Sequence, residues 1–136
     1  MPEKITVLVP EDVAGSFTRA RESVGVEERV FFPIKGFVDG QEVGSVDSYI
    51  IIQKSLDGVE VFATLNNVHV EEEFRRRGLG GKMVRELEAT ARELGCSYIW
   101  GYISVNDLHY KPWLREFYEK LGFEIDENRK IVKALW

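Results

Sequence analysis

The sequence predicts an α/β fold built on a mixed, mostly antiparallel β-sheet. Two Asp-Gly pairs, Asp39-Gly40 and Asp57-Gly58, separate apolar segments and are typical of tight hairpins, because these residues accept positive φ. From residue 59 to residue 105, an apolar segment, an amphipathic helical segment and a second apolar segment follow one another. A strand-helix-strand unit of this length implies one parallel strand pair in the sheet.

The first half of the chain is predicted to consist mainly of strands. Residues 4–9 have the apolar, β-branched composition of a strand, and apolar residues at helical spacing indicate a helix over residues 11–23. Further strands are expected over residues 29–38, 43–53 and 59–70, joined by the two Asp-Gly turns. These three strands should form an antiparallel set.

The strand over residues 59–70 changes the face that carries its apolar side chains. Its apolar residues fall into two sets of opposite parity: Val59, Val61, Ala63 and Leu65, then Val68 and Val70. One face of a strand cannot hold both sets unless one residue is inserted. We therefore expect a β-bulge near Asn66 and Asn67, which leaves backbone N–H and C=O groups free for a ligand.

The second half of the chain begins with the most regular helix in the sequence. Residues 79–94 place apolar side chains on one face and charged side chains on the other, and Gly95 follows as a C-terminal glycine. Residues 97–105 read as a buried strand, and a helix over residues 113–121 is expected to end at a glycine. Two short strands are predicted within residues 123–135.

Composition and charge exclude several classes of protein. Hydrophobic residues make up 44% of the 136 residues, which is too much for a disordered chain, and we expect a single domain covering residues 1–136. No apolar run is long enough for a membrane helix, and the lone Cys96 suits a reducing, cytoplasmic location. The net charge of −5 argues against an extended nucleic-acid-binding face. We expect no metal site.

A turn rich in glycine and arginine, VEEEFRRRGLGGKMV, leads into the helix over residues 79–94. The first amides of a helix have no intrahelical partner and its dipole is positive there, so a phosphate fits this place. Gly78, Gly80 and Gly81 allow an anion to approach the backbone, and an arginine adds charge-assisted bonds. The spacing matches neither the dinucleotide fingerprint nor the P-loop. A tight turn with a solvated basic run is the alternative.

Two motifs together resemble those of a known family. The pattern Arg75-x-x-Gly78-x-Gly80 resembles the central signature of the GNAT superfamily of acyl-CoA-dependent N-acetyltransferases, and residues 117–123 (FYEKLGF) resemble its second signature. The resemblance covers residues 28–135. It implies a single GNAT-like domain with a splayed central strand pair, helices on both faces of the sheet, and acetyl-CoA as cosubstrate.

The resemblance also implies where acetyl-CoA binds. Backbone groups of residues 68–70 would bond the pantetheine arm between the splayed strands, and the amides of residues 76–81 would hold the pyrophosphate. Arg76 or Arg77 would reach a phosphate, while one of the three arginines stays solvated. The expected cofactor-binding residues are Val68, His69, Val70, Arg75, Arg76, Arg77, Gly78, Leu79, Gly80 and Gly81.

The implied reaction is transfer of an acetyl group to a primary amine by direct attack in a ternary complex. Tyr118 matches the family tyrosine that protonates the departing thiolate, although its apolar helical stripe also suits a core residue. The backbone N–H of Val68 would polarise the thioester carbonyl. Glu60 and Asn66 are the candidates for receiving the amine proton, directly or through water. Other candidates remain open: His69, Glu72 and His109.

The chain departs from the family pattern at Lys111, where many members have asparagine. We expect residues 106–112 to form a loop that shapes the acceptor pocket, with Pro112 opening the next helix. The alternative function is a catalytically inactive acyl-CoA-binding or protein-interaction module with the same fold. The acceptor amine is unidentified, no nucleic-acid or membrane partner is expected, and both a monomer and a homodimer are compatible with the sequence.

Overall fold

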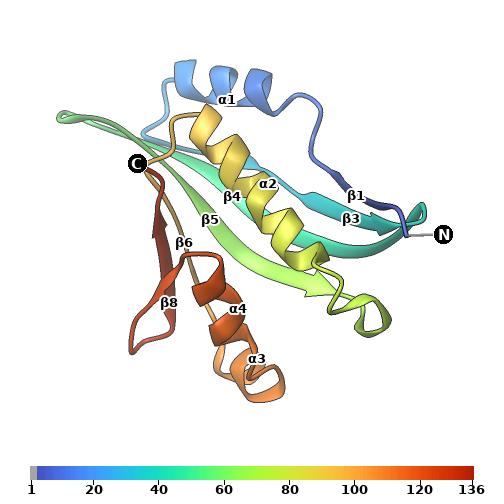
Figure 1. Cartoon of the computed structure of the whole chain (residues 1–136). Helices are drawn as coiled ribbons and strands as arrows, with labels where there is room; N and C mark the ends of the chain where they lie inside the picture. Colours follow the sequence, from blue (N-terminus) through green and yellow to red (C-terminus); the bar gives the residue numbers. More distant parts are fainter. Residues whose placement is uncertain (1–2) are drawn as a thin grey trace.

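The computed structural model describes residues 3–136, which fold around a mixed β-sheet flanked by helices (Figure 1). The strands are β1 (Ile5–Leu8), β2 (Glu27–Phe31), β3 (Ile34–Val38), β4 (Gln41–Ser55), β5 (Gly58–Val70), β6 (Tyr98–Tyr102), β7 (Glu124–Ile125) and β8 (Lys130–Ala134). The helices are α1 (Val13–Glu22), α2 (Leu79–Glu93), α3 (Val105–Tyr110) and α4 (Leu114–Lys120), with a short 3-10 helix, η1 (Glu72–Phe74). The order of the strands in the sheet is β1-β3-β4-β5-β6-β8-β7, and β2 also pairs with β4. Among the described strands only the β5–β6 pair is parallel, which confirms the predicted fold class.

Both Asp-Gly turns form hairpins as predicted. Asp39 and Gly40, between β3 and β4, have φ values of 50° and 84°, and Gly58, the first residue of β5, has a φ of 130°. These left-handed conformations suit glycine, and aspartate tolerates them better than most residues. The two turns therefore set the order β3-β4-β5 in the sheet.

The segment over residues 29–38 forms two strands, so the prediction of one continuous strand is wrong. Phe32 and Pro33 separate β2 from β3, and both strands pair with the long strand β4. Proline has no N–H to donate to a sheet, which explains the break. The Phe32 N–H still bonds the Ser48 carbonyl at 2.8 Å, and the Ser48 hydroxyl donates to the Phe32 carbonyl at 2.5 Å.

The predicted bulge in β5 is confirmed. Asp47 of β4 pairs with Asn67, whereas the next residue, Ser48, pairs with Leu65, so Asn66 is the inserted residue. The insertion lets the strand turn its apolar side chains to a new face after Leu65. It follows directly after Ala63 and Thr64, the residues of β5 that pair with β6.

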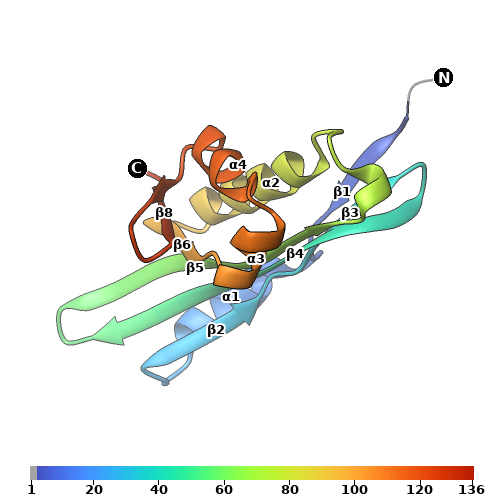
Figure 2. The same cartoon turned by 90° about the horizontal axis from the view of Figure 1, so that it is seen from below.

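Helices cover both faces of the sheet. Figures 1 and 2 show α2 and α4 on one face and α1 on the opposite face. Leu79, at the start of α2, packs on glycines of β3 and β4: a Cβ at Gly36 would lie 2.7 Å from Leu79 Cδ1. The core between the layers contains large, fully buried side chains: Phe32, Ile34, Ile50, Ile52, Met83, Leu87 and Ile99. No helix within residues 3–136 combines the length and apolar character of a membrane span.

A helix, α3, occupies most of the segment predicted to be a loop. The preceding strand ends at Tyr102, earlier than predicted, and Ser104 caps α3 by accepting a hydrogen bond from the Asp107 N–H at 3.0 Å. A serine followed three residues later by an acidic residue is a known helix-start pattern. The sequence therefore contained a signal for α3.

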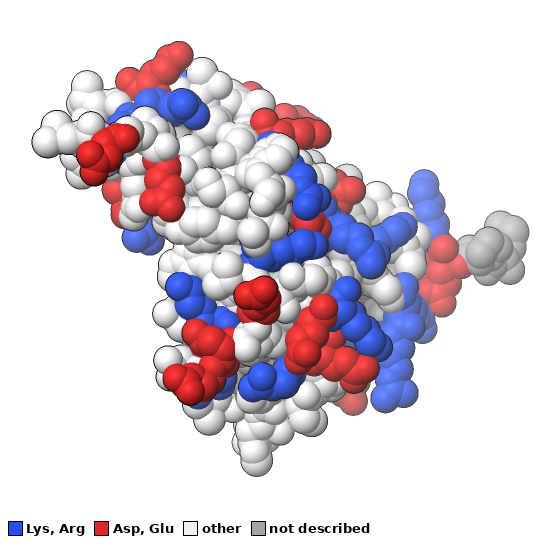
Figure 3. Space-filling model, turned by 60° about the vertical axis from the view of Figure 1, so that its left-hand side comes forward, with Lys and Arg blue, Asp and Glu red and all other residues white. Residues whose placement is uncertain are grey.

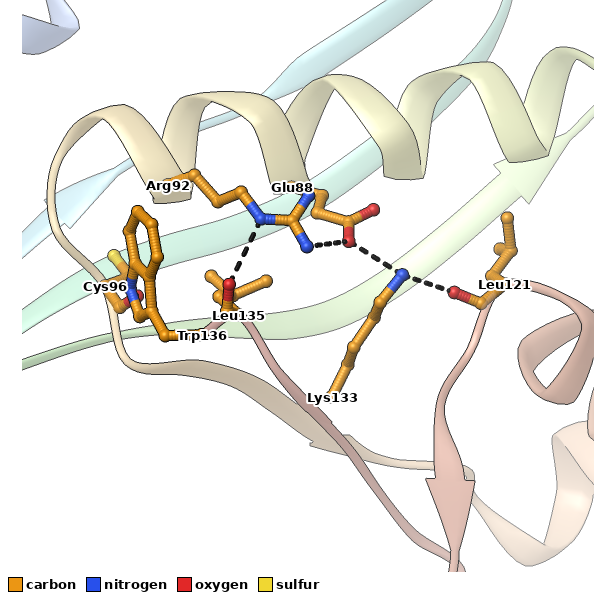
Figure 4. Close-up of polar contacts among 7 residues, drawn as sticks. All are labelled: Glu88, Arg92, Cys96, Leu121, Lys133, Leu135 and Trp136. Carbon is orange, nitrogen blue, oxygen red and sulfur yellow. Dashed lines mark hydrogen bonds and ion pairs between the residues drawn. The ribbon is translucent and has the colours of Figure 1, made fainter.

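An ion-pair cluster fastens the C-terminal elements to α2 (Figure 4). The Glu88 carboxylate lies 2.7 Å from Lys133 Nζ and 3.1 Å from Arg92. Lys133 also donates to the Leu121 carbonyl at 2.7 Å, at the end of α4. We call these four residues the Glu88 brace, since they join α2, α4 and β8.

Candidate active site

The strands β5 and β6 pair over a short distance and then separate. Their parallel register joins Ala63 to Ile99 and Thr64 to Trp100, after which β5 runs on to Val70 away from β6 (Figure 1). A Cβ at Gly101 would lie 2.2 Å from the Leu65 carbonyl oxygen, so only glycine allows this close approach before the strands diverge. The divergence leaves a V-shaped opening in the sheet.

A cavity of about 620 Å³, which we call the large cavity, lies beside the end of β5. Its walls come from the end of β5, the glycine-rich turn, the first turn of α2 and the beginning of α4. Representative lining residues are Val68, Val70, Arg76, Gly80, Trp113 and Phe117. The sides of the cavity formed by β5 and α4 are therefore apolar. The side formed by the glycine-rich turn consists of backbone and arginine.

The turn that borders the large cavity contains backbone amides without a hydrogen-bond partner. Gly78 caps α2 with a φ of 79°, and its carbonyl accepts from the Lys82 N–H at 3.0 Å. Within residues 3–136, the amides of residues 76–81 have no hydrogen-bond partner. A Cβ at Gly80 would come within 3.3 Å of the Phe117 ring, so this glycine lets α4 close over the turn. The positive end of the α2 dipole adds to the attraction for an anion.

The three arginines of the turn have different surroundings. Arg75 Nε donates to the Val70 carbonyl at 2.9 Å and so fixes the end of β5. Arg76, with a φ of 67°, lines the large cavity. Arg77 forms an ion pair with Glu3 and lies 5.0 Å over the Phe74 ring, outside the cavity lining. On the face drawn in Figure 3, acidic and basic side chains are interspersed.

Tyr118 reaches a second, smaller hollow of about 20 Å³. Its side chain is 6% exposed and its ring packs against those of Phe117 and Phe123 at 5.1 and 5.7 Å. Burial raises the pKa of the Tyr118 phenol, and the nearby charge of Asp107 raises it further. The phenol is therefore protonated at neutral pH. Other polar side chains line the small hollow: Asn66, Asn67, Tyr102, Asp107 and Lys111.

The two hollows adjoin. Val68, Lys111 and Leu114 line both of them. A molecule that fills the large cavity along β5 thus ends next to the small hollow and to Tyr118. Residues 106–112, which include Lys111, were expected from the sequence to shape the acceptor pocket as a loop. Asp107 was not named individually, and it lies in the helix α3.

The remaining candidates for proton acceptance are scattered. Asn66 lines the small hollow and its Oδ1 accepts from the Thr64 hydroxyl at 2.7 Å. Glu60 lies toward the other end of β5, exposed beside Tyr98, and lines neither hollow. His69 is exposed and is absent from both linings, unlike its neighbours Val68 and Val70. His109 is exposed on α3, and Glu72 borders the large cavity.

The one cysteine and the possible metal-ligating side chains lie as follows. Cys96 is fully buried, and burial raises the pKa of its thiol to about 12, which suppresses the reactive thiolate. Among residues 3–136, no three His, Cys, Asp or Glu side chains gather in a metal-binding arrangement.

Comparisons with known proteins agree with this geometry. The fold is similar to that of aminoglycoside acetyltransferase HMB0005 from an uncultured soil metagenomic sample, with 18% identity, coverage of 93% of this chain and 94% of that chain, and a TM-score of 0.64. It is also similar to Arabidopsis thaliana Naa50 in complex with the bisubstrate analogue CoA-Ac-MVNAL, with 18% identity, 74% and 71% coverage, and a TM-score of 0.58. A transcriptional regulator from Bacillus halodurans C-125 has 22% identity, 85% and 70% coverage, and a TM-score of 0.59. No curated protein sequence matches the chain. Residues 29–125 match the acetyltransferase (GNAT) domain, and the chain therefore belongs to this family.

Proposed function

We propose that the protein transfers an acetyl group from acetyl-CoA to a primary amine, by direct attack within a ternary complex. The observation that carries the proposal is the junction of the two hollows: the large cavity is lined by a turn with free amides, and it adjoins the small hollow that Tyr118 lines. Among the proteins of similar fold are aminoglycoside acetyltransferases and a Naa50 bound to a CoA-containing analogue. Their chemistry supports the same assignment here.

The residues of the large cavity fit acetyl-CoA. Its volume of about 620 Å³ lies within the usual range of ligand sites. We propose that the amides of residues 76–81 hold the diphosphate, with Arg76 adding charge. The strand backbone at residues 68–70 would run beside the pantetheine arm. Arg75 acts as a positioning residue, since it fixes the Val70 carbonyl at the end of that strand.

The chemistry of transfer divides among few groups of this chain. When bound, acetyl-CoA supplies the activated acetyl thioester. Tyr118 holds a proton at its hydroxyl, because burial and Asp107 raise its pKa, and can donate it to the departing sulfur. The N–H of Val68, beside the bulge, is the proposed oxyanion donor. Asn66 can orient a water in the small hollow, whereas Glu60, outside both linings, has no direct part in this proposal.

The test is thiol release on mixing acetyl-CoA with a panel of primary amines. We expect turnover in the wild type and a loss of at least about tenfold in Tyr118→Phe, the usual scale for removing a general acid. Calorimetry should show unchanged CoA affinity in this variant. The control is Tyr110→Phe, because Tyr110 is 78% exposed and lines neither hollow.

The other outcomes separate the alternatives. CoA binding without turnover on any amine would favour the catalytically inactive acyl-CoA-binding module. Failure to bind CoA at all would refute both functions.

A further inference from the structure

Asp107 faces the small hollow beside Tyr118, and the transfer chemistry above gives its carboxylate no contact with substrate. The residue sits in the first turn of α3, where Ser104 holds its backbone N–H at 3.0 Å. Its side chain forms no ion pair within residues 3–136. Asp107 and Tyr118 both line this hollow, and the charge of Asp107 contributes to raising the pKa of the Tyr118 phenol.

The small hollow has room for the end of a narrow chain. Its volume of about 20 Å³ is enough for roughly one water-sized group, since a water needs about 10 to 15 Å³ on this measure. A primary amine nitrogen is of that size. Its N–H groups need acceptors, and the lining offers the Asp107 carboxylate and the side-chain oxygens of Asn66 and Asn67. An aromatic amine or a branched amine is too wide.

The charges around the hollow are ordered. Lys111, the other charged side chain of the lining, borders both hollows, whereas Asp107 borders only the small one. The lining of the large cavity carries three basic side chains, Arg75, Arg76 and Lys111, against one carboxylate, Glu72, so a cation is favoured in the small hollow beside Asp107 rather than in the large cavity. This arrangement separates an amine site from a site for an anionic cosubstrate.

We propose that Asp107 recognises the acceptor, and that the acceptor is an unbranched primary alkylamine that is cationic in solution. The Asp107 carboxylate contacts the acceptor nitrogen beside Tyr118. A lysine-like side chain and the end of a polyamine share this chemistry. The inference rests on the proposed function and adds the substrate class and one catalytic residue to it.

The role of Asp107 follows from the charge balance of the reaction. The acceptor ammonium first loses a proton to water, and the neutral nitrogen then bonds to the acetyl carbon. The carbon–sulfur bond breaks, its electron pair stays on sulfur, and sulfur takes the proton of Tyr118. The nitrogen is positive until its extra proton passes to water, and Tyr118 regains a proton from solvent. A fixed carboxylate stabilises this transient positive charge.

The experiment compares Asp107→Asn with the wild type on two acceptors. Cadaverine is a linear alkylammonium, and methoxyamine is an equally narrow primary amine that is neutral at neutral pH. We expect kcat/KM for cadaverine to fall at least about tenfold in Asp107→Asn, as is typical when a charged hydrogen-bond partner is lost. The value for methoxyamine should change less than about twofold, and CoA affinity by calorimetry should be unchanged. Glu119→Gln is the control, because Glu119 is exposed and lines neither hollow.

The outcomes distinguish this inference from the proposed function. Equal kcat/KM for cadaverine in Asp107→Asn and wild type, or an equal loss for both amines, would overturn the role of Asp107 and leave the transferase intact. A wild type without turnover on any amine would refute the proposed function instead. In that case cadaverine is titrated into the CoA-loaded protein by calorimetry. Weaker binding in Asp107→Asn supports the recognition role, and equal binding overturns it.

Discussion

Replacing Lys133 with methionine should loosen the attachment of α4 and β8 to α2, because Lys133 is the centre of the Glu88 brace. The side chains of Lys133 and Glu88 are only 20% and 13% exposed, and Lys133 Nζ lies 2.7 Å from both the Glu88 carboxylate and the Leu121 carbonyl. Methionine keeps the apolar stem and removes the charge. The substitution therefore tests the polar contacts rather than packing.

The size of the effect can be estimated from these contacts. Hydrogen bonds to charged groups contribute about 1.5 to 3 kcal/mol, more than the ~0.2 to 1 kcal/mol of an exposed pair. Glu88 keeps Arg92 at 3.1 Å, so its carboxylate is not left unpaired and the larger cost of a buried lone charge does not arise. We expect Lys133→Met to lower the free energy of unfolding by about 1.5 to 3 kcal/mol.

Urea denaturation of Lys133→Met and Lys120→Met gives the comparison. Lys120 pairs with Glu116 at 3.0 Å on the surface of α4, where the two side chains are 74% and 72% exposed. Its replacement should cost no more than about 0.5 kcal/mol, as for other exposed i,i+4 pairs. Equal destabilisation by the two substitutions would refute the reasoning, because it would mean that the burial of the brace contributes nothing.

Three further predictions concern close packing and titration. Gly101→Ala should destabilise the fold by about 3 kcal/mol or more, because the new Cβ would lie 2.2 Å from the Leu65 carbonyl oxygen. Gly81→Ala is the control, because its Cβ would meet nothing closer than 3.8 Å. A lower Tm for Gly81→Ala than for Gly101→Ala would contradict this prediction. Cys96 should resist thiol reagents in the native protein and react on unfolding. Since burial raises its pKa from 9.0 to about 12, its contribution to stability is complete below pH 9 and is lost as the pH rises toward 12, and Cys96→Ala should show a shallower alkaline decline. The pKa of Tyr118 is also raised, so its phenol should remain neutral at the pH values, about 10, at which tyrosines ordinarily ionise. An absorbance titration in which Tyr118 ionises together with the exposed tyrosines would disprove this prediction.

The fold was largely predictable because its signals are local. The Asp-Gly turns, the parity change in β5 and the amphipathic pattern of α2 each reflect the geometry of neighbouring residues, and each is found as predicted. The split at Pro33 was missed because the apolar pattern continues across this proline. The two strands on either side of it, β2 and β3, pair with the same long strand, β4. The helix α3 was missed although Ser104 and Asp107 carry a capping signal.

The part of the candidate site that is formed by backbone groups was predictable from the sequence. The glycine-rich turn lies on the large cavity, and Tyr118 lies in the adjoining hollow. Side-chain direction was not predictable, because it depends on contacts between distant segments. Arg77 is drawn to Glu3, which lies far away in sequence, and Glu60 lies on the predicted strand but away from both hollows. Asp107 enters the site only through the turn of α3 beside Tyr118.

A crystal structure with bound CoA is the most direct test of the central claim, which is that the turn before α2 is an anion site built from backbone. The account predicts diphosphate oxygens about 2.7 to 3.2 Å from amide nitrogens within residues 76–81, with the thiol end directed toward Tyr118. CoA bound elsewhere, with these amides facing water, would contradict it.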